Sequence, residues 1–147
     1  MTVIQLESFY SNENPWFLFK YLETYFPKTK AEDIYHYLIM HGLDSNFPNE
    51  GKDFFQQLNK TKLLKRVEEE VNHLQKLWDG PDVPIFILPI DAEHPVWKNQ
   101  KEKSGLAFQD KLFLFIHEKL DWNEIKALLT HEYNHVCRLK HYKKAVE

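Results

Sequence analysis

The sequence predicts an α+β fold, with helices in the N-terminal half and a small β-sheet packed on one C-terminal helix. Apolar residues recur at helical spacing over residues 1–80, which we expect to be mainly helical. Short strands and a loop are expected over residues 83–116, and a capped helical pattern occupies residues 121–141. A chain of 147 residues is the size of one domain and can bury a core, so we expect a single domain over residues 1–147.

Composition and charge exclude several classes of function. Hydrophobic residues make up 43% of the chain and charged residues 28%, which is ordinary for a globular protein and argues against disorder. The net charge is only −3 and the basic residues are dispersed, so we expect neither nucleic acid nor a membrane as a partner. No apolar run reaches the length of a membrane span, and the N-terminus lacks a secretory signal pattern. The lone Cys137 cannot form an internal disulfide, and we therefore expect a cytoplasmic protein.

The first helix is expected over residues 15–26. Asn14 provides an N-cap, Pro15 suits the first helical position, and Pro27 ends the segment. Apolar side chains cover most of its circumference, which is typical of a helix buried between other elements or of a helix with a binding face. The aromatic residues whose exposure separates these alternatives are Trp16, Phe17, Tyr21 and Tyr25.

Two further helices are expected before the strands. Thr29 and Glu32 have the spacing of a capping box at the start of a helix over residues 30–41, and Gly42 follows as its C′ residue. A third helical pattern runs over residues 48–78 and ends at a Gly-Pro pair. We expect it to be one long helix with a single apolar stripe.

Two apolar runs rich in β-formers follow. The first covers residues 83–90, where prolines favour a short or edge strand. Residues 91–104 are polar and aperiodic and should form a loop. Residues 105–116 resume β character, either as one strand with an irregularity near Asp110 or as a hairpin.

The most specific feature of the chain is a His-Glu-x-x-His motif at residues 131–135. On a helix, His131 and His135 lie about 40° apart around the axis and about 6 Å apart along it, so both can bind one metal ion. Zn²⁺ in such a site acidifies a bound water, and the carboxylate of Glu132 accepts its proton as the water attacks a carbonyl. The motif predicts His131 and His135 as zinc ligands and Glu132 as the general base.

The context of the motif supports a helix. Asp121 and Glu124 form a capping box, and apolar residues follow at helical spacing. One alternative remains open, in which two partly buried histidines lie in an ordinary amphipathic helix and bind no metal.

A catalytic zinc site normally has three protein ligands and a water. His141 has the spacing of the third histidine in His-Glu-x-x-His-x-x-Gly-x-x-His, but Arg138 occupies the glycine position, so a continuing helix would carry His141 to the far side. Glu147 is the only acidic residue after the motif, and chain ends are poor places for a rigid ligand. Both are candidate third ligands. Arg138 lies on the histidine side, where it orients a substrate carbonyl or carboxylate or is an ordinary surface arginine.

The segment Asp-Lys-Leu-Phe-Leu-Phe-Ile at residues 110–116, followed by Leu-Leu-Thr-His-Glu-Tyr-Asn-His-Val-Cys-Arg-Leu at 128–139, resembles the core of the bacterial YjaZ-type proteins, a group of predicted zinc-dependent proteases. The resemblance implies a zincin-like fold in which an apolar strand lines a substrate groove above the motif helix. It also implies a further ligand, of acidic type, beyond the motif. We therefore expect this chain to lack the C-terminal part of the family, as a truncated protein, a short relative, or one that recruits the ligand from a partner.

Two functions follow as hypotheses. The first is a zinc-dependent peptidase, or its core fragment, which hydrolyses a peptide or protein substrate that pairs with a strand near residues 105–116. The second is a catalytically inactive zincin-like domain that binds peptides or proteins, with the aromatic N-terminal helices as its functional surface. A structural zinc site with a closed coordination sphere is a further alternative. The substrate and the oligomeric state do not follow from the sequence.

Overall fold

The computed structural model describes residues 2–91, 93, 104–117 and 120–146, with side chains up to residue 140. Most of the loop predicted over residues 91–104 lies outside these ranges. The described elements confirm the α+β class. The α-helices are α1 (Trp16–Leu22), α2 (Ala31–Met40), α3 (Phe47–Thr61), α4 (Leu63–Trp78) and α6 (Trp122–Val146), and the short 3₁₀ helices are η1 (Leu6–Phe9) and η2 (Glu23–Tyr25). Within the described ranges, none of the helices is long and apolar enough to cross a membrane.

The sheet has the strand order β1-β3-β2. Its strands are β1 (Ile85–Pro89), β2 (Gly105–Ala107) and β3 (Leu112–Ile116). β1 runs parallel to β3, and β2 pairs antiparallel with β3, with Gly105 opposite Leu114. The Phe108 N–H donates to the Lys111 carbonyl at 3.0 Å and closes the turn between β2 and β3. Residues 105–116 are therefore a hairpin, one of the two alternatives that the sequence left open.

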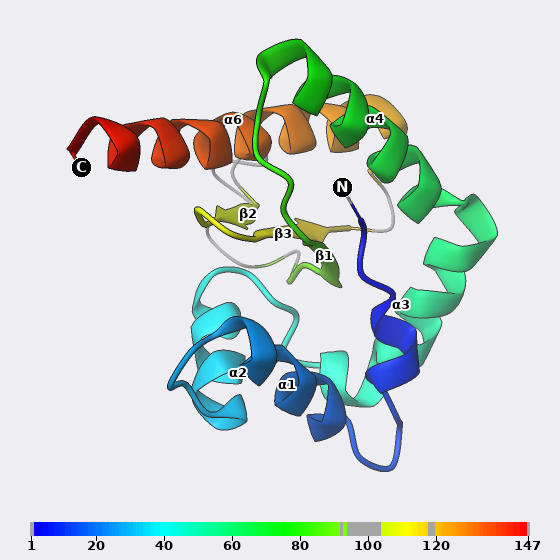
Figure 1. Cartoon of the computed structure of the whole chain (residues 1–147). Helices are drawn as coiled ribbons and strands as arrows, with labels where there is room; N and C mark the ends of the chain where they lie inside the picture. The colour runs from blue at the N-terminus through cyan, green and yellow to red at the C-terminus, as the bar shows by residue number, and fades with distance from the viewer. Residues whose placement is uncertain (1, 92, 94–103, 118–119, 147) are drawn as a thin grey trace.

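The sheet lies between α6 on one face and the pair α1 and α2 on the other, while α3 and α4 run along its side (Figure 1). Side chains alternate between these faces because the period of a strand is two residues. Phe86 and Phe113 are in register and stack at 4.6 Å, and on their face they meet Tyr25 at 4.8 Å and Phe26 at 5.7 Å. The alternate row, which includes Gly105, faces α6. Burial on both faces explains why β1 and β3 are apolar runs.

The N-terminal helices begin close to the predicted positions. The segment expected as a helix over 15–26 is α1 followed by η2, with Pro15 as the residue before the helix. The predicted capping box of α2 is wrong: its N-cap is Lys30 and has no side-chain hydrogen bond. The Thr29 hydroxyl donates to the Pro27 carbonyl at 3.3 Å, so a local turn satisfies it instead of the helix N-terminus.

The predicted C-terminus of α2 is confirmed. Gly42 has a φ of +120°, a conformation that L side chains rarely adopt. Its N–H donates to the Ile39 carbonyl at 3.2 Å, and the Leu43 N–H donates to the Leu38 carbonyl at 3.0 Å. These two bonds form a Schellman motif, which satisfies carbonyls that the helix leaves without partners.

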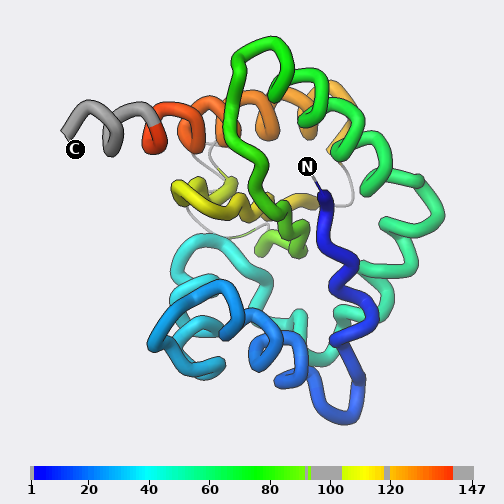
Figure 2. The backbone as a smooth tube through the Cα atoms, viewed as in Figure 1, coloured from blue at the N-terminus to red at the C-terminus, as the bar shows by residue number. Residues whose placement is uncertain are grey.

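The single helix predicted over residues 48–78 is wrong, because two helices, α3 and α4, meet at Lys62. Lys62 is left-handed, with φ 54° and ψ 29°, and the backbone changes direction between the two helices (Figure 2). Neither glycine nor proline marks this break, so the local sequence gives no signal for it. The turn allows α3 to pack beside β1 while α4 packs against α6.

Candidate metal centre

The helix that carries the motif is fixed at its start by a cap. Asp121 Oδ1 accepts the N–H of Glu124 at 2.8 Å, which confirms Asp121 as the capping residue of α6. Ile125, Leu128 and Leu129 are buried and attach the next turns to the core. The motif therefore lies on a helix whose rotation about its own axis is set by packing.

Tyr133, inside the motif, provides a second point of attachment. Its side chain is fully buried, its hydroxyl donates to the Pro81 carbonyl at 2.9 Å, and its ring stacks on Trp78 with centroids 5.9 Å apart. A Cβ at Gly80 would overlap the Tyr133 hydroxyl, so only glycine fits there. Burial, and after it the neighbouring Cys137 thiol, raises the pKa of Tyr133. The expected packing of Cys137 is confirmed, and burial raises the pKa of its thiol as well.

The anchoring of Tyr133 directs the two histidines to the opposite side of α6. His131 Nε2 and His135 Nε2 are 3.2 Å apart, and the rings are nearly perpendicular, at 85°. Two nitrogens bound to one tetrahedral Zn²⁺ at its usual Zn–N distance are separated by roughly 3.3 Å. His135 is exposed and His131 is half-buried, so this pair of nitrogens is accessible from solvent. The donor set and its spacing fit a zinc ion.

Glu132 lies under the edge strand β2 and is only 5% exposed. A Cβ at Gly105 would be 2.8 Å from Glu132 Cγ and 2.9 Å from the Phe113 carbonyl oxygen, so glycine is required for the carboxylate to lie here. The sequence did not single out Gly105. The only local signal was a glycine at the start of a predicted strand, which is typical of close backbone approach.

The motif and the edge strand border one hollow of about 340 Å³. Its lining residues are Gly105, Leu106, Ala107, His131, Glu132, His135 and Leu139. A buried carboxylate, two imidazoles and a short strand therefore surround one space, in which an extended chain can approach all three. Leu139 contributes an apolar surface at 43% exposure, a role that the sequence did not predict.

The other candidate residues are placed differently. Arg138 is exposed and is not among the residues that line this hollow in the described part of the chain. α6 continues through residue 141 to Val146, as expected without a glycine at position 138, but the His141 side chain and Glu147 lie outside the description. Among the described residues, no three His, Cys, Asp or Glu side chains form a group that could hold one metal ion. The third ligand is therefore unassigned.

Comparison with known proteins shows the family of the chain. A family described as "Predicted Zn-dependent protease (DUF2268)" matches residues 63–147, which cover α4, the sheet and α6. The chain belongs to this family. The uncharacterized protein YjaZ of Bacillus subtilis (strain 168) is 41% identical over 118 residues, which are 80% of this chain and 45% of that relative. The chain thus spans about half the length of the curated relative it matches. No solved structure matches it.

Proposed function

We propose that this protein is a zinc-dependent peptidase, or the core of one, with His131 and His135 as zinc ligands and Glu132 as the general base. The observation that carries the proposal is the 3.2 Å separation of the two Nε2 atoms beside a buried carboxylate that borders the same hollow. The family description and the α+β arrangement of sheet and motif helix support it.

Zinc, when bound, supplies an acidified water and polarises the substrate carbonyl. Metal binding and proton transfer are assigned to residues of the chain. His131 and His135 would hold the ion, and the Glu132 carboxylate would accept a proton from the attacking water and donate it to the leaving amine. Because Glu132 is buried beneath β2, its position is fixed before substrate binds.

The pairing of the strands supports β2 as the substrate strand within the expected range 105–116. β3 is paired on both edges, with β1 and with β2. Val3 bridges Ile85 and covers part of the outer edge of β1. In the described part of the chain, the outer edge of β2 pairs with no other strand. We propose that a peptide substrate adds to β2 in extended form, with its scissile carbonyl above the histidine pair.

The third ligand is proposed to be acidic and to lie in the part of the relative that this chain does not cover. His141 and Glu147 are the candidates within the chain. Arg138 directly precedes Leu139, which lines the hollow. We propose that Arg138 contacts a bound peptide that extends beyond the hollow.

The test measures zinc content and peptide hydrolysis for the chain and for a full-length family member. Glu132→Gln should retain zinc and lose about a hundredfold or more in hydrolysis, since a general base contributes at least that much. His131→Ala should lose zinc. Asn134→Ala, at an exposed position of the same motif, is the control and should behave as wild type. A folded protein that binds no zinc, or a Glu132→Gln variant as active as wild type, would refute the proposal.

The alternative function, an inactive peptide- or protein-binding module, has one observation in its favour. Trp16 is 42% exposed and Phe17 is 57% exposed on α1. The other two aromatics predicted to decide the question are half-buried: the Tyr21 ring stacks on Phe9 at 3.6 Å, and its hydroxyl is 3.1 Å from that of Tyr25. Burial, and after it the interaction with the Tyr25 hydroxyl, raises the pKa of Tyr21 to about 12. The exposed aromatic surface of α1 is therefore small, and the metal centre remains the better-supported site.

A further inference from the structure

A second hollow lies at the carboxyl ends of the parallel strands β1 and β3. It has a volume of about 570 Å³ and is bordered by the loop before α3, the first turns of α3, and the residues at the ends of the two strands. It shares no lining residue with the metal centre. In open α/β sheets, ligands bind preferentially at the carboxyl ends of parallel strands, and β1 and β3 are such a parallel pair within this mixed sheet.

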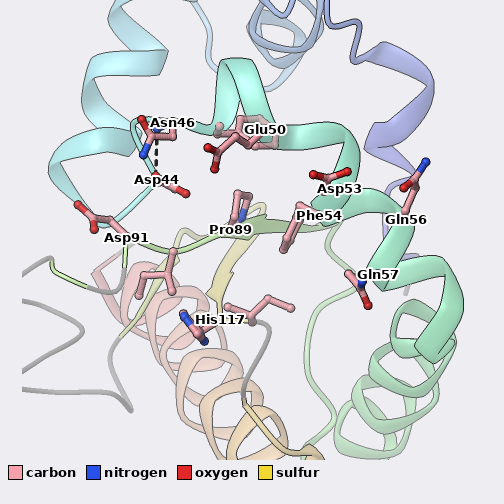
Figure 3. A pocket seen from close by; sticks show the side chains of 13 residues that line it. Asp44, Asn46, Glu50, Asp53, Phe54, Gln56, Gln57, Pro89, Asp91 and His117 are labelled. Atoms are coloured by element: carbon pink, nitrogen blue, oxygen red, sulfur yellow. Dashed lines mark hydrogen bonds between the residues drawn. The ribbon is translucent and has the colours of Figure 1, made fainter.

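Negative charge dominates this hollow. Its lining includes the carboxylates of Asp44, Glu50, Asp53 and Asp91 and contains no lysine or arginine. Asp44, Glu50 and Asp53 lie along one side, and His117 lies on the opposite side (Figure 3). Within the described residues, no ion pair involves any of the four carboxylates. A hollow lined by charges of one sign concentrates counter-charged ligands.

A mainly apolar hollow of about 200 Å³ lies beside the acidic one. The two hollows adjoin along α3, because both are lined by Phe54, Gln57, Ile116 and His117, and together we call them the α3 groove. The apolar part is bordered mainly by α3, α4 and the start of α6. Its lining includes Trp122, and the guanidinium of Arg66 stands 4.5 Å from the centre of that ring. The α3 groove therefore offers four carboxylates at one end and, at the other, a mainly apolar surface with the Arg66 guanidinium over the Trp122 ring.

We propose that the α3 groove binds a peptide segment of a partner protein in which lysine or arginine side chains lie next to a large apolar residue. The cationic side chains complement the acidic end, and the apolar side chain enters the space between α3 and α6. The same carboxylates repel nucleic acid and anionic lipid, and they disfavour a second copy of this acidic chain. The site does not depend on zinc, because no zinc-ligand candidate among the described residues lines it.

The proposal is tested by fluorescence anisotropy with a labelled peptide, Gly-Lys-Lys-Ala-Leu-Phe-Gly. The protein carries Glu132→Gln, so that hydrolysis cannot consume the probe. We expect saturable binding that weakens with salt. Gly-Glu-Glu-Ala-Leu-Phe-Gly should not bind, and Gly-Lys-Lys-Ala-Ser-Ser-Gly should bind more weakly because it lacks the apolar side chains.

A matched pair of variants locates the binding. Glu50→Gln with Asp53→Asn removes two exposed carboxylates of the groove and should weaken binding about fivefold or more. Glu32→Gln with Asp33→Asn makes the same charge change at the exposed first turn of α2, outside the groove, and should leave affinity unchanged. Equal weakening by both pairs, equal binding of the acidic peptide, self-association through the groove, or no saturable binding would overturn the proposal. Adding His131→Ala should not affect peptide binding at the α3 groove. This variant therefore tests the inference separately from the proposed peptidase function, which requires His131.

Discussion

At the residue scale, Gly105 controls where the Glu132 carboxylate can lie. Gly105→Ala would place a methyl group 2.8 Å from Glu132 Cγ and against the Phe113 carbonyl. We expect a loss of about 1–3 kcal/mol in the free energy of unfolding from overpacking, measured by urea denaturation. Under the proposed function, peptide hydrolysis should fall further than stability does, because the proposed general base, Glu132, is displaced. Ala107→Ser on the same strand is the control, and an equal effect there would argue against a special role for Gly105.

Tyr133 anchors the motif helix through its hydroxyl. Tyr133→Phe keeps the ring between Trp78 and the core but removes the bond to the Pro81 carbonyl. We expect a loss of about 1 kcal/mol in the free energy of unfolding. Tyr35→Phe is the matched control, because the described residues give its hydroxyl no hydrogen bond, and it should change stability by less than about 0.5 kcal/mol. Indistinguishable losses from the two variants would contradict this role for the Tyr133 hydroxyl.

At the scale of the elements, the break between α3 and α4 depends on a strained residue. Lys62 is left-handed, a conformation that costs an L residue about 1–2 kcal/mol and costs glycine almost nothing. Lys62→Gly should therefore raise the free energy of unfolding by about 0.5–1 kcal/mol, after the extra chain entropy of glycine is subtracted. Lys60→Gly, two residues earlier in α3, should instead lower it by about 1 kcal/mol. Thermal or urea unfolding of both variants checks the sign of the change in the free energy of unfolding. Destabilisation by Lys62→Gly would show that α3 and α4 prefer to form one continuous helix.

At the scale of the whole molecule, one buried cluster extends from Val3 to Cys137 and joins both helical layers to the sheet. Phe113 is fully buried in this cluster, stacked on Phe86 and in contact with Phe26. A shared core predicts one cooperative unfolding transition, with the same midpoint by circular dichroism and by tryptophan fluorescence. Phe113→Ala should lower the free energy of unfolding by about 3–5 kcal/mol and shift both signals together. Two separate transitions, with only one sensitive to Phe113→Ala, would show that the N-terminal helices unfold independently.

The sequence by itself determined the features that depend on local periodicity. The spacing of His131 and His135 placed them together because a helix repeats every 3.6 residues. Asp121 marked the start of that helix, and Gly42 marked the end of α2, because caps are satisfied by neighbouring residues. The apolar runs identified β1 and the β segment over residues 105–116, but the choice between one strand and a hairpin and the pairing order were not predicted. The family resemblance was also carried by two short segments of the sequence, residues 110–116 and 128–139.

Only the tertiary structure decided the features that join distant parts of the chain. The requirement for glycine at 105 comes from Glu132, and the anchor of Tyr133 comes from Pro81, 52 residues away. The break at Lys62 allows α3 and α4 to pack on different partners, against a continuous helical pattern in the sequence. The α3 groove exists because strand ends and helices meet there. The local pattern determines that the two motif histidines share one side of a helix, whereas packing between distant segments determines which surfaces surround them and which strand edge lies beside them.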